Sequence, residues 1–156
     1  MTHTLVRRAV LSLALLAPLV LQAAPPPYDE AADAKAEIRA GLAAAAQARV
    51  PLLVVFGANW CGDCKVLDMA FKSGSSAPLI QKHFKVVKVN VGRFDRNVDI
   101  AEGYGVPLKT GIPAVAVLSA QGQVLYATRG GELADARHMG EQGIYDFFAK
   151  VSAPVR

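Results

Sequence analysis

Apolar residues along the chain occur in short continuous runs, which predict strands, and at a spacing of three or four residues, which predicts helices. The two patterns alternate along the chain. Residues 51–56 form a continuous apolar run without polar alternation, which is typical of a central strand buried on both faces. Further strands are predicted at residues 85–91, where valine dominates, and at residues 114–118. Residues 119–123 have the composition of a turn, which predicts a hairpin that returns through a last strand at residues 124–128.

Helices are predicted where apolar residues recur every three or four positions. Residues 29–48 are rich in alanine and have this spacing between charged side chains, which predicts an amphipathic helix over one face of the sheet. Its periodic positions are Ala31, Ala34, Ile38, Leu42, Ala45 and Ala46. Shorter helices are expected at 61–72, 77–84 and 98–104, a loop at 105–112, an irregular stretch at 130–140, and a C-terminal helix with Ile144, Phe147, Phe148 and Val151 on one face. This order predicts an α/β fold, in which helices flank a mixed central sheet and a helical extension precedes it.

The first residues have the three-part pattern of a secretory signal peptide. Arg7 and Arg8 precede an apolar run at residues 9–21, and small residues follow before three consecutive prolines. We therefore expect cleavage near Ala23 and export, to the periplasm of a bacterium. The alternative is an uncleaved membrane anchor, but the run is shorter than the ~20 apolar residues of a spanning helix and contains Pro18. The predicted organisation is a signal peptide at 1–23, a linker and N-terminal helix at 24–50, and one domain at 51–152.

The charge of the chain gives no sign of a nucleic-acid partner. The formal net charge is +4, from 17 basic and 13 acidic residues. Removal of Arg7 and Arg8 with the signal peptide leaves 15 basic residues against 13 acidic ones, a charge of +2. Since the basic residues form no cluster of the kind that binds phosphates, binding to DNA or RNA is not expected.

The chain has two cysteines, Cys61 and Cys64, which are separated by two residues and preceded by Trp60. A disulfide over so short a loop removes little entropy from the unfolded chain, so a structural staple explains the pair poorly. A pair that alternates between dithiol and disulfide carries out redox chemistry without a further cofactor. Zinc is the alternative, but it takes about four ligands, and the chain beyond the signal peptide adds only His83 and His138. We therefore expect no metal.

Four motifs follow one another along the chain. They are Ala58-Asn59-Trp60-Cys61-Gly62-Asp63-Cys64-Lys65 after the first strand, Val87-Lys88-Val89-Asn90-Val91 in the second, then Tyr104-Gly105-Val106, and Gly111-Ile112-Pro113-Ala114 before the third. A lone Cys-x-x-Cys would be weak evidence, since zinc sites also use it. In this order the motifs resemble the thioredoxin superfamily over residues 51–131. The resemblance implies a thioredoxin fold and is greatest to exported thioredoxin-like proteins with a helical N-terminal extension.

The resemblance implies roles for the residues around the pair. Cys61 would be the attacking thiolate, and Cys64 would be the buried resolving thiol. Trp60, Ile112 and Pro113 would contact the substrate, with Pro113 following a cis peptide bond. Independently of the family, Cys61 lies at the predicted start of a helix, where free N–H groups and the helix dipole favour a thiolate.

One departure from the family concerns the acid that serves the resolving cysteine. Thioredoxins usually carry a buried aspartate in the strand before the motif, where this chain has Val55. Lys88 matches the partly buried lysine that the family has in the next strand. Asp68, one helical turn after Cys64, is a candidate substitute base, but a solvent-facing Asp68 is the favoured interpretation.

A second departure is Gly62-Asp63 between the cysteines, where thioredoxins have Gly-Pro. Asp63 would place a negative charge near Cys61 and oppose formation of the thiolate, which makes the couple more reducing. We expect an exposed Asp63, whose charge is screened by solvent, so the effect is modest. Gly62, Asp63 and Lys88 are thus the residues expected to tune the ionisation of the pair.

These observations predict a thiol–disulfide oxidoreductase that reduces protein disulfides outside the cytoplasm through the couple of Cys61 and Cys64. We expect a monomer with two kinds of partner, a protein disulfide substrate and a membrane protein that donates electrons. One alternative is a disulfide oxidase or isomerase with the same site. Another is a redox-inert thioredoxin-like module that binds extended peptides, although both cysteines and Trp60 argue against it.

Overall fold

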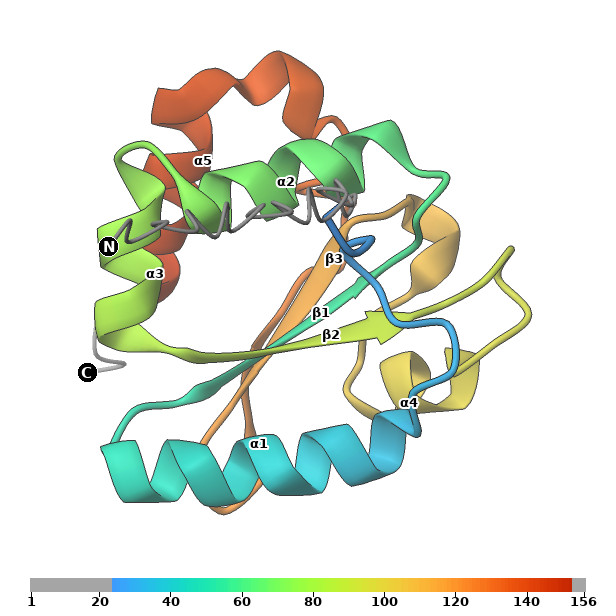
Figure 1. Ribbon diagram of the computed structural model, residues 1–156, viewed down its shortest axis with the longest axis vertical. Helices are drawn as coiled ribbons and strands as arrows, with labels where there is room; N and C mark the ends of the chain where they lie inside the picture. The colour runs from blue at the N-terminus through green and yellow to red at the C-terminus, as the bar shows by residue number, and fades with distance from the viewer. Residues whose placement is uncertain (1–23, 153–156) are drawn as a thin grey trace, which may run out of the picture.

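A computed structural model describes residues 24–152 of the chain, and the predicted signal peptide at 1–23 lies outside them. Its centre is a four-stranded sheet in the order β2-β1-β3-β4 (Figure 1). β1 and β2 are parallel, whereas β3 runs antiparallel to β1 and forms a hairpin with β4. The strands are β1 (Leu52–Gly57), β2 (Lys85–Asn90), β3 (Ala114–Leu118) and β4 (Val124–Ala127). The predicted mixed sheet is therefore confirmed.

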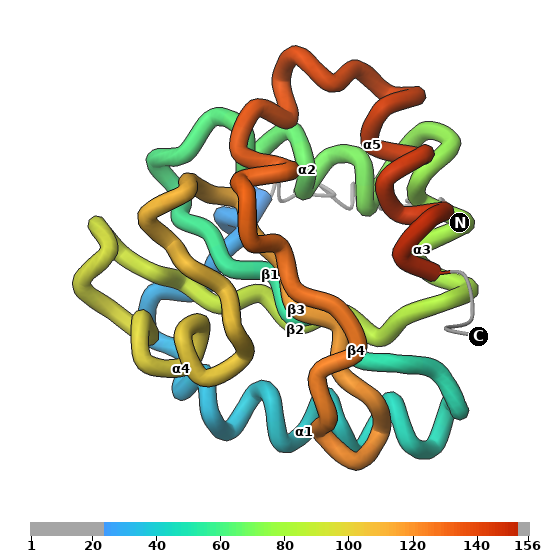
Figure 2. The backbone as a smooth tube through the Cα atoms, turned by 180° about the vertical axis from the view of Figure 1, so that it is seen from behind, coloured from blue at the N-terminus to red at the C-terminus, as the bar shows by residue number. Residues whose placement is uncertain are grey.

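The helices cover both faces of this sheet, as Figures 1 and 2 show from opposite sides. α1 and α4 lie on one face, and α2, α3 and α5 lie on the other. The elements are α1 (Ala34–Ala48), α2 (Gly62–Lys72), α3 (Ser76–His83), α4 (Val98–Gly103), the 3-10 turn η1 (Leu108–Thr110) and α5 (Ala136–Ser152). Within residues 24–152, no helix has the length and apolar character needed to cross a membrane.

The side chains of β1 explain why its sequence is apolar throughout. Leu52, Val54 and Phe56 belong to the core on one side of the sheet, whereas Leu53 and Val55 belong to the core on the other. All five are at most 1% exposed. Because successive side chains of a strand point to opposite faces, a strand between two layers of helices has no polar face.

The N-terminal helix starts later than the sequence pattern predicts. Asp33 caps it by accepting a hydrogen bond from the backbone N–H of Ala36, as N-terminal aspartates commonly do. Ala31 and Ala46, two of the predicted apolar positions, are exposed. Residues 24–33, here called the N-terminal strap, are not helical; they run from the side of α2 past the end of β2 to the start of α1 (Figure 1).

Two further predictions need correction. The expected loop at residues 105–112 contains one 3-10 turn, η1. The expected irregular stretch at residues 130–140 contains the first turn of α5, which then kinks at Gly140, where φ is 66°. A glycine adopts this left-handed conformation without a steric penalty, so the helix changes direction there.

Candidate active site

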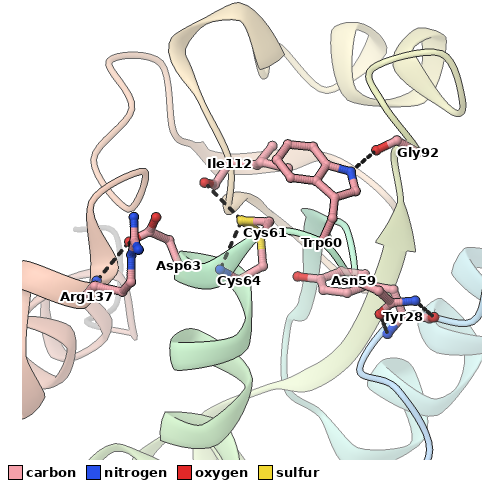
Figure 3. Close-up of a disulfide and its surroundings, with 9 residues drawn as sticks. All are labelled: Tyr28, Asn59, Trp60, Cys61, Asp63, Cys64, Gly92, Ile112 and Arg137. Atoms are coloured by element: carbon pink, nitrogen blue, oxygen red, sulfur yellow. Dashed lines mark hydrogen bonds and ion pairs between the residues drawn. A yellow bond between two sulfur atoms is a disulfide. The ribbon is translucent and has the colours of Figure 1, made fainter.

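The two cysteines form a disulfide where β1 gives way to α2 (Figure 3). Cys61 caps α2, and its Sγ accepts a hydrogen bond from the backbone N–H of Cys64 at 3.1 Å. This N–H group and the positive end of the helix dipole both stabilise negative charge on Cys61 once the disulfide opens. The predicted place of Cys61 at the start of a helix is therefore confirmed.

Both cysteines of the disulfide are buried, and the loop before β3 lies close to Cys61. Cys61 is 5% exposed and Cys64 is fully buried. The carbonyl oxygen of Ile112 lies 3.6 Å from Cys61 Sγ. The peptide bond between Ile112 and Pro113 is cis, which confirms the isomer that the family resemblance implied. The fold thus brings Ile112 and Pro113 to the disulfide from positions about fifty residues away in the chain.

Trp60 precedes Cys61 and is half exposed. Its indole Nε1–H donates a hydrogen bond to the carbonyl oxygen of Gly92 at 2.8 Å. The ring also packs edge-on against Phe94, with 5.9 Å between the ring centroids. Phe94 is itself exposed and has a φ of 65°, a conformation that bulky residues rarely adopt. Phe94 is therefore a part of the site that the sequence pattern did not predict.

A cleft of about 740 Å³ adjoins this aromatic pair. Phe94 and Leu108 line it, together with Gly111, the residue before Ile112. Two basic residues, Lys109 and Arg129, and one acidic residue, Glu102, also line it. An apolar cleft beside the aromatic pair is a suitable place for a side chain of an extended substrate.

Asp63 is buried, and the expectation of an exposed, solvent-screened side chain is wrong. It is 8% exposed, and its Oδ1 accepts hydrogen bonds from Arg137, from the backbone N–H at 2.9 Å and from Nε at 3.2 Å (Figure 3). Burial alone would raise the pKa of Asp63, but the hydrogen bonds and charge of Arg137 outweigh it and lower the pKa. The carboxylate is therefore ionised but paired, and Arg137 offsets much of the repulsion that the sequence predicted at Cys61.

Gly62 lies under the same arginine. A Cβ atom at Gly62 would be 3.4 Å from Arg137 Nη1, an ordinary van der Waals distance, so the Arg137 side chain lies against the first residue of α2. Arg137 is separated from Asp63 by 74 residues, and no local pattern indicates that the two meet.

Asp68 is also buried, so the favoured interpretation of a solvent-facing side chain is wrong. It is 8% exposed and forms ion pairs with Lys88, from β2, and with Lys72, at 2.7 Å. Burial alone would raise the pKa of Asp68, but the hydrogen bonds and charges of the two lysines outweigh it and lower the pKa. Lys88 is the register partner of Val55. The lysine beside Val55, the position at which thioredoxins usually carry an acid, is thus paired with an acid on α2.

The two histidines considered as zinc ligands do not approach the cysteines. His138 is exposed and pairs with Asp135, and His83 is the last residue of α3. Among the residues that the structure describes, no three His, Cys, Asp or Glu side chains gather as metal ligands would.

Comparison with known proteins agrees with this architecture. Among solved structures, the disulphide isomerase from Xylella fastidiosa Temecula1 is 52% identical, with a TM-score of 0.80, over 84% of this chain and 100% of that one. The reduced DsbD c-terminal domain of Neisseria meningitidis is 17% identical, with a TM-score of 0.51, over 74% of this chain and 95% of that one, a likeness that shows the fold alone. No curated protein matches the chain. A family model described as thioredoxin-like matches residues 33–120, more than half of the chain. The predicted thioredoxin fold is confirmed, and the chain belongs to the thioredoxin-like family.

Proposed function

We propose that the chain is a thiol–disulfide oxidoreductase that reduces protein disulfides through Cys61 and Cys64. The observation that carries the proposal is the disulfide at the N-terminus of α2. Cys61 follows the half-exposed Trp60, and Cys64 is fully buried. The likeness to the Xylella disulphide isomerase, over the whole of that chain, supports thiol–disulfide exchange as the chemistry.

The exchange begins with the reduced protein. The Cys61 thiolate attacks one sulfur of a substrate disulfide, a mixed disulfide forms, and the other substrate sulfur leaves with the electron pair and takes up a proton. The Cys64 thiol then loses its proton and attacks Cys61 Sγ, which releases the second substrate thiolate and closes the Cys61–Cys64 disulfide. Asp68 follows Cys64 by four residues on α2 and is buried, and it is the proton acceptor that we assign to Cys64.

Isomerisation is the second candidate, because the Xylella relative is described as an isomerase. It shares the first step, but the substrate's own thiol must then attack the mixed disulfide before Cys64 does. Cys64 is buried on the same helix as Asp68, the assigned acceptor of its proton. This arrangement favours rapid resolution of the mixed disulfide by Cys64, and hence net reduction of the substrate. The two functions differ in their need for Cys64: reduction requires both cysteines, whereas isomerisation requires only Cys61.

The proposal includes the cellular setting that the sequence suggests. After cleavage near Ala23 the protein acts outside the cytoplasm, in the bacterial periplasm. A reductase in an oxidising compartment needs a source of electrons, so we propose a membrane protein as donor and a disulfide-bonded protein as substrate. The protein acts as a monomer.

The redox equilibrium with glutathione tests the direction of the reaction. We expect a potential well below the about −120 mV of strong disulfide oxidases, together with reduction of insulin that is lost in Cys61→Ser and in Cys64→Ser. A potential near that of the oxidases would contradict a reductase. If Cys64→Ser still reshuffles a scrambled protein substrate as fast as the unaltered protein, isomerisation is the better assignment. If Cys61→Ser keeps full activity in cells, the redox-inert peptide-binding module replaces both.

A further inference from the structure

Tyr28 is a buried tyrosine that the mechanism above does not use. It lies in the N-terminal strap, outside the helices and strands, yet it is only 1% exposed. Its side chain belongs to the same core cluster as Cys61 and Cys64. In Figure 3 the hydroxyl end of its ring is directed toward the cysteine pair. A strap residue thus contributes a polar atom to the buried side of the disulfide.

Asn59, the residue before Trp60, holds the strap in this position. Its Oδ1 accepts a hydrogen bond from the Tyr28 backbone N–H at 3.0 Å, and its Nδ2 donates one to the Tyr28 carbonyl oxygen at 2.8 Å. The same Nδ2 lies 2.9 Å from a carboxylate oxygen of Glu30. Arg96 adds a hydrogen bond to the carbonyl oxygen of Glu30 at 3.1 Å. These contacts tie the strap to the loop that carries the active-site motif, so Tyr28 is fixed relative to the cysteines.

Gly57 leaves the space in which the tyrosine oxygen and the cysteine sulfur meet. A Cβ atom on Gly57 would overlap the Tyr28 hydroxyl oxygen and would lie 3.0 Å from Cys64 Sγ. The tyrosine hydroxyl therefore occupies the space that a side chain at residue 57 would fill, and Cys64 Sγ borders the same space. Cys64 Sγ is the atom that resolves the mixed disulfide.

The hydroxyl in this position is a neutral donor. Burial, and then the negative charge of Asp68, raise the pKa of Tyr28 above its ordinary value. The group keeps its proton across the range in which thiols ionise. A buried hydroxyl that keeps its proton can donate a hydrogen bond to an anion that forms beside it.

We propose that the Tyr28 hydroxyl donates a hydrogen bond to Cys64 Sγ when the disulfide is open, and thereby favours the Cys64 thiolate that attacks Cys61. The inference rests on the proposed thiol–disulfide exchange. The proton of Cys64 still leaves to Asp68, and the Tyr28 proton stays on its oxygen throughout. The charge of Asp68, from α2, acts on the Tyr28 hydroxyl, and Asp68 is paired with Lys88, from β2. Tyr28 supplies the donor that this ion pair does not.

The test is Tyr28→Phe, which removes the hydroxyl and keeps the ring. In the reduced protein, NMR titration of the Cys64 β-carbon should show ionisation at a pH about one unit higher, because a hydrogen bond to a charged group is worth at least about tenfold in an equilibrium. Resolution of a mixed disulfide at neutral pH should slow by about threefold, because the tenfold loss of thiolate is partly offset by the higher nucleophilicity of a more basic thiolate. Alkylation of Cys61 should keep its pH profile. Tyr104→Phe is the matched control: Tyr104 is half-buried next to α4 and lines a different pocket, and its loss should change none of these values.

A purely structural role would give a different result. If Tyr28→Phe lowers the Tm but leaves the ionisation of Cys64 and the rate of resolution unchanged, the inference is wrong. Asn59→Ala is a second variant, which keeps the Tyr28 hydroxyl but removes the two hydrogen bonds that hold the Tyr28 backbone. It should shift the ionisation of Cys64 in the same direction by a smaller amount. No shift in Asn59→Ala, if Tyr28→Phe does not fold, also contradicts the inference. The titration needs no turnover, so its outcome is separate from the tests of the proposed function, which measure the redox potential and the activity of the unaltered protein and of the cysteine variants.

Discussion

Gly57→Ala is expected to lower the free energy of unfolding of the oxidised protein by about 1–3 kcal/mol, the usual cost of an extra methyl group in a close-packed core. The added methyl would overlap the Tyr28 hydroxyl and lie 3.0 Å from Cys64 Sγ. Neither neighbour can move away easily, because Asn59 anchors the Tyr28 backbone and the disulfide fixes Cys64. Urea unfolding followed by tryptophan fluorescence measures the change.

Gly103→Ala is the matched control for this prediction. Gly103 is the last residue of α4, and a Cβ atom there would meet nothing within 4 Å. We expect its stability to equal or slightly exceed that of the unaltered protein, since alanine favours a helix over glycine. The double variant Gly57→Ala/Tyr28→Ala should recover part of the loss caused by Gly57→Ala relative to Tyr28→Ala alone. Equal stability of Gly57→Ala and Gly103→Ala would contradict the close packing at Gly57.

Asp68→Asn is expected to lower the free energy of unfolding at neutral pH by about 1–3 kcal/mol, because it leaves Lys88 without its charged partner in a largely buried position. The loss should depend on pH. The lysines lower the pKa of Asp68 in the folded protein, so its stabilisation is complete above the unfolded pKa of about 3.9 and is lost as the pH falls through the lower folded pKa. The stability difference between the two proteins should therefore be constant from about pH 5 to 8 and shrink below about pH 4.

The same variant should slow the attack of Cys64 on mixed disulfides, because the assigned proton acceptor is gone. Urea unfolding at several pH values and single-turnover kinetics measure the two effects. Asp99→Asn is the control, since Asp99 pairs with Lys35 on the exposed surface and such pairs contribute little. If Asp68→Asn is as harmless as Asp99→Asn in both measurements, the assignment of Asp68 as the base is wrong.

The fold could be predicted because its signals are local. The continuous apolar run of β1 requires helices on both faces, and the spacing of Cys61 and Cys64 after it requires a helix that begins at the pair. Pro113 at the start of a strand indicated a special backbone conformation, and the Ile112–Pro113 bond is cis. Each of these inferences uses residues that are close together in the sequence.

The electrostatics of the site could not be predicted, because they depend on contacts between distant segments. The sequence around Asp63 predicts an exposed charge, because Arg137, which donates hydrogen bonds to it, is 74 residues away. The sequence around Asp68 predicts a surface residue, because its partner Lys88 lies on another element, β2, and reaches it only through the register of the sheet. Tyr28 had a local signal, a single aromatic residue just before the N-terminal helix, but nothing in the sequence indicates where its hydroxyl lies.

The most direct test of the central claim, exchange through Cys61 with resolution by Cys64, is a trapping measurement. Cys64→Ser, produced from the full sequence, should hold substrates as disulfide-linked species that a reductant releases and that mass spectrometry locates at Cys61. The unaltered protein should hold few of them, because Cys64 resolves them, and Cys61→Ser/Cys64→Ser should hold none. Failure of Cys64→Ser to hold any partner, or attachment at a site other than Cys61, would contradict the account.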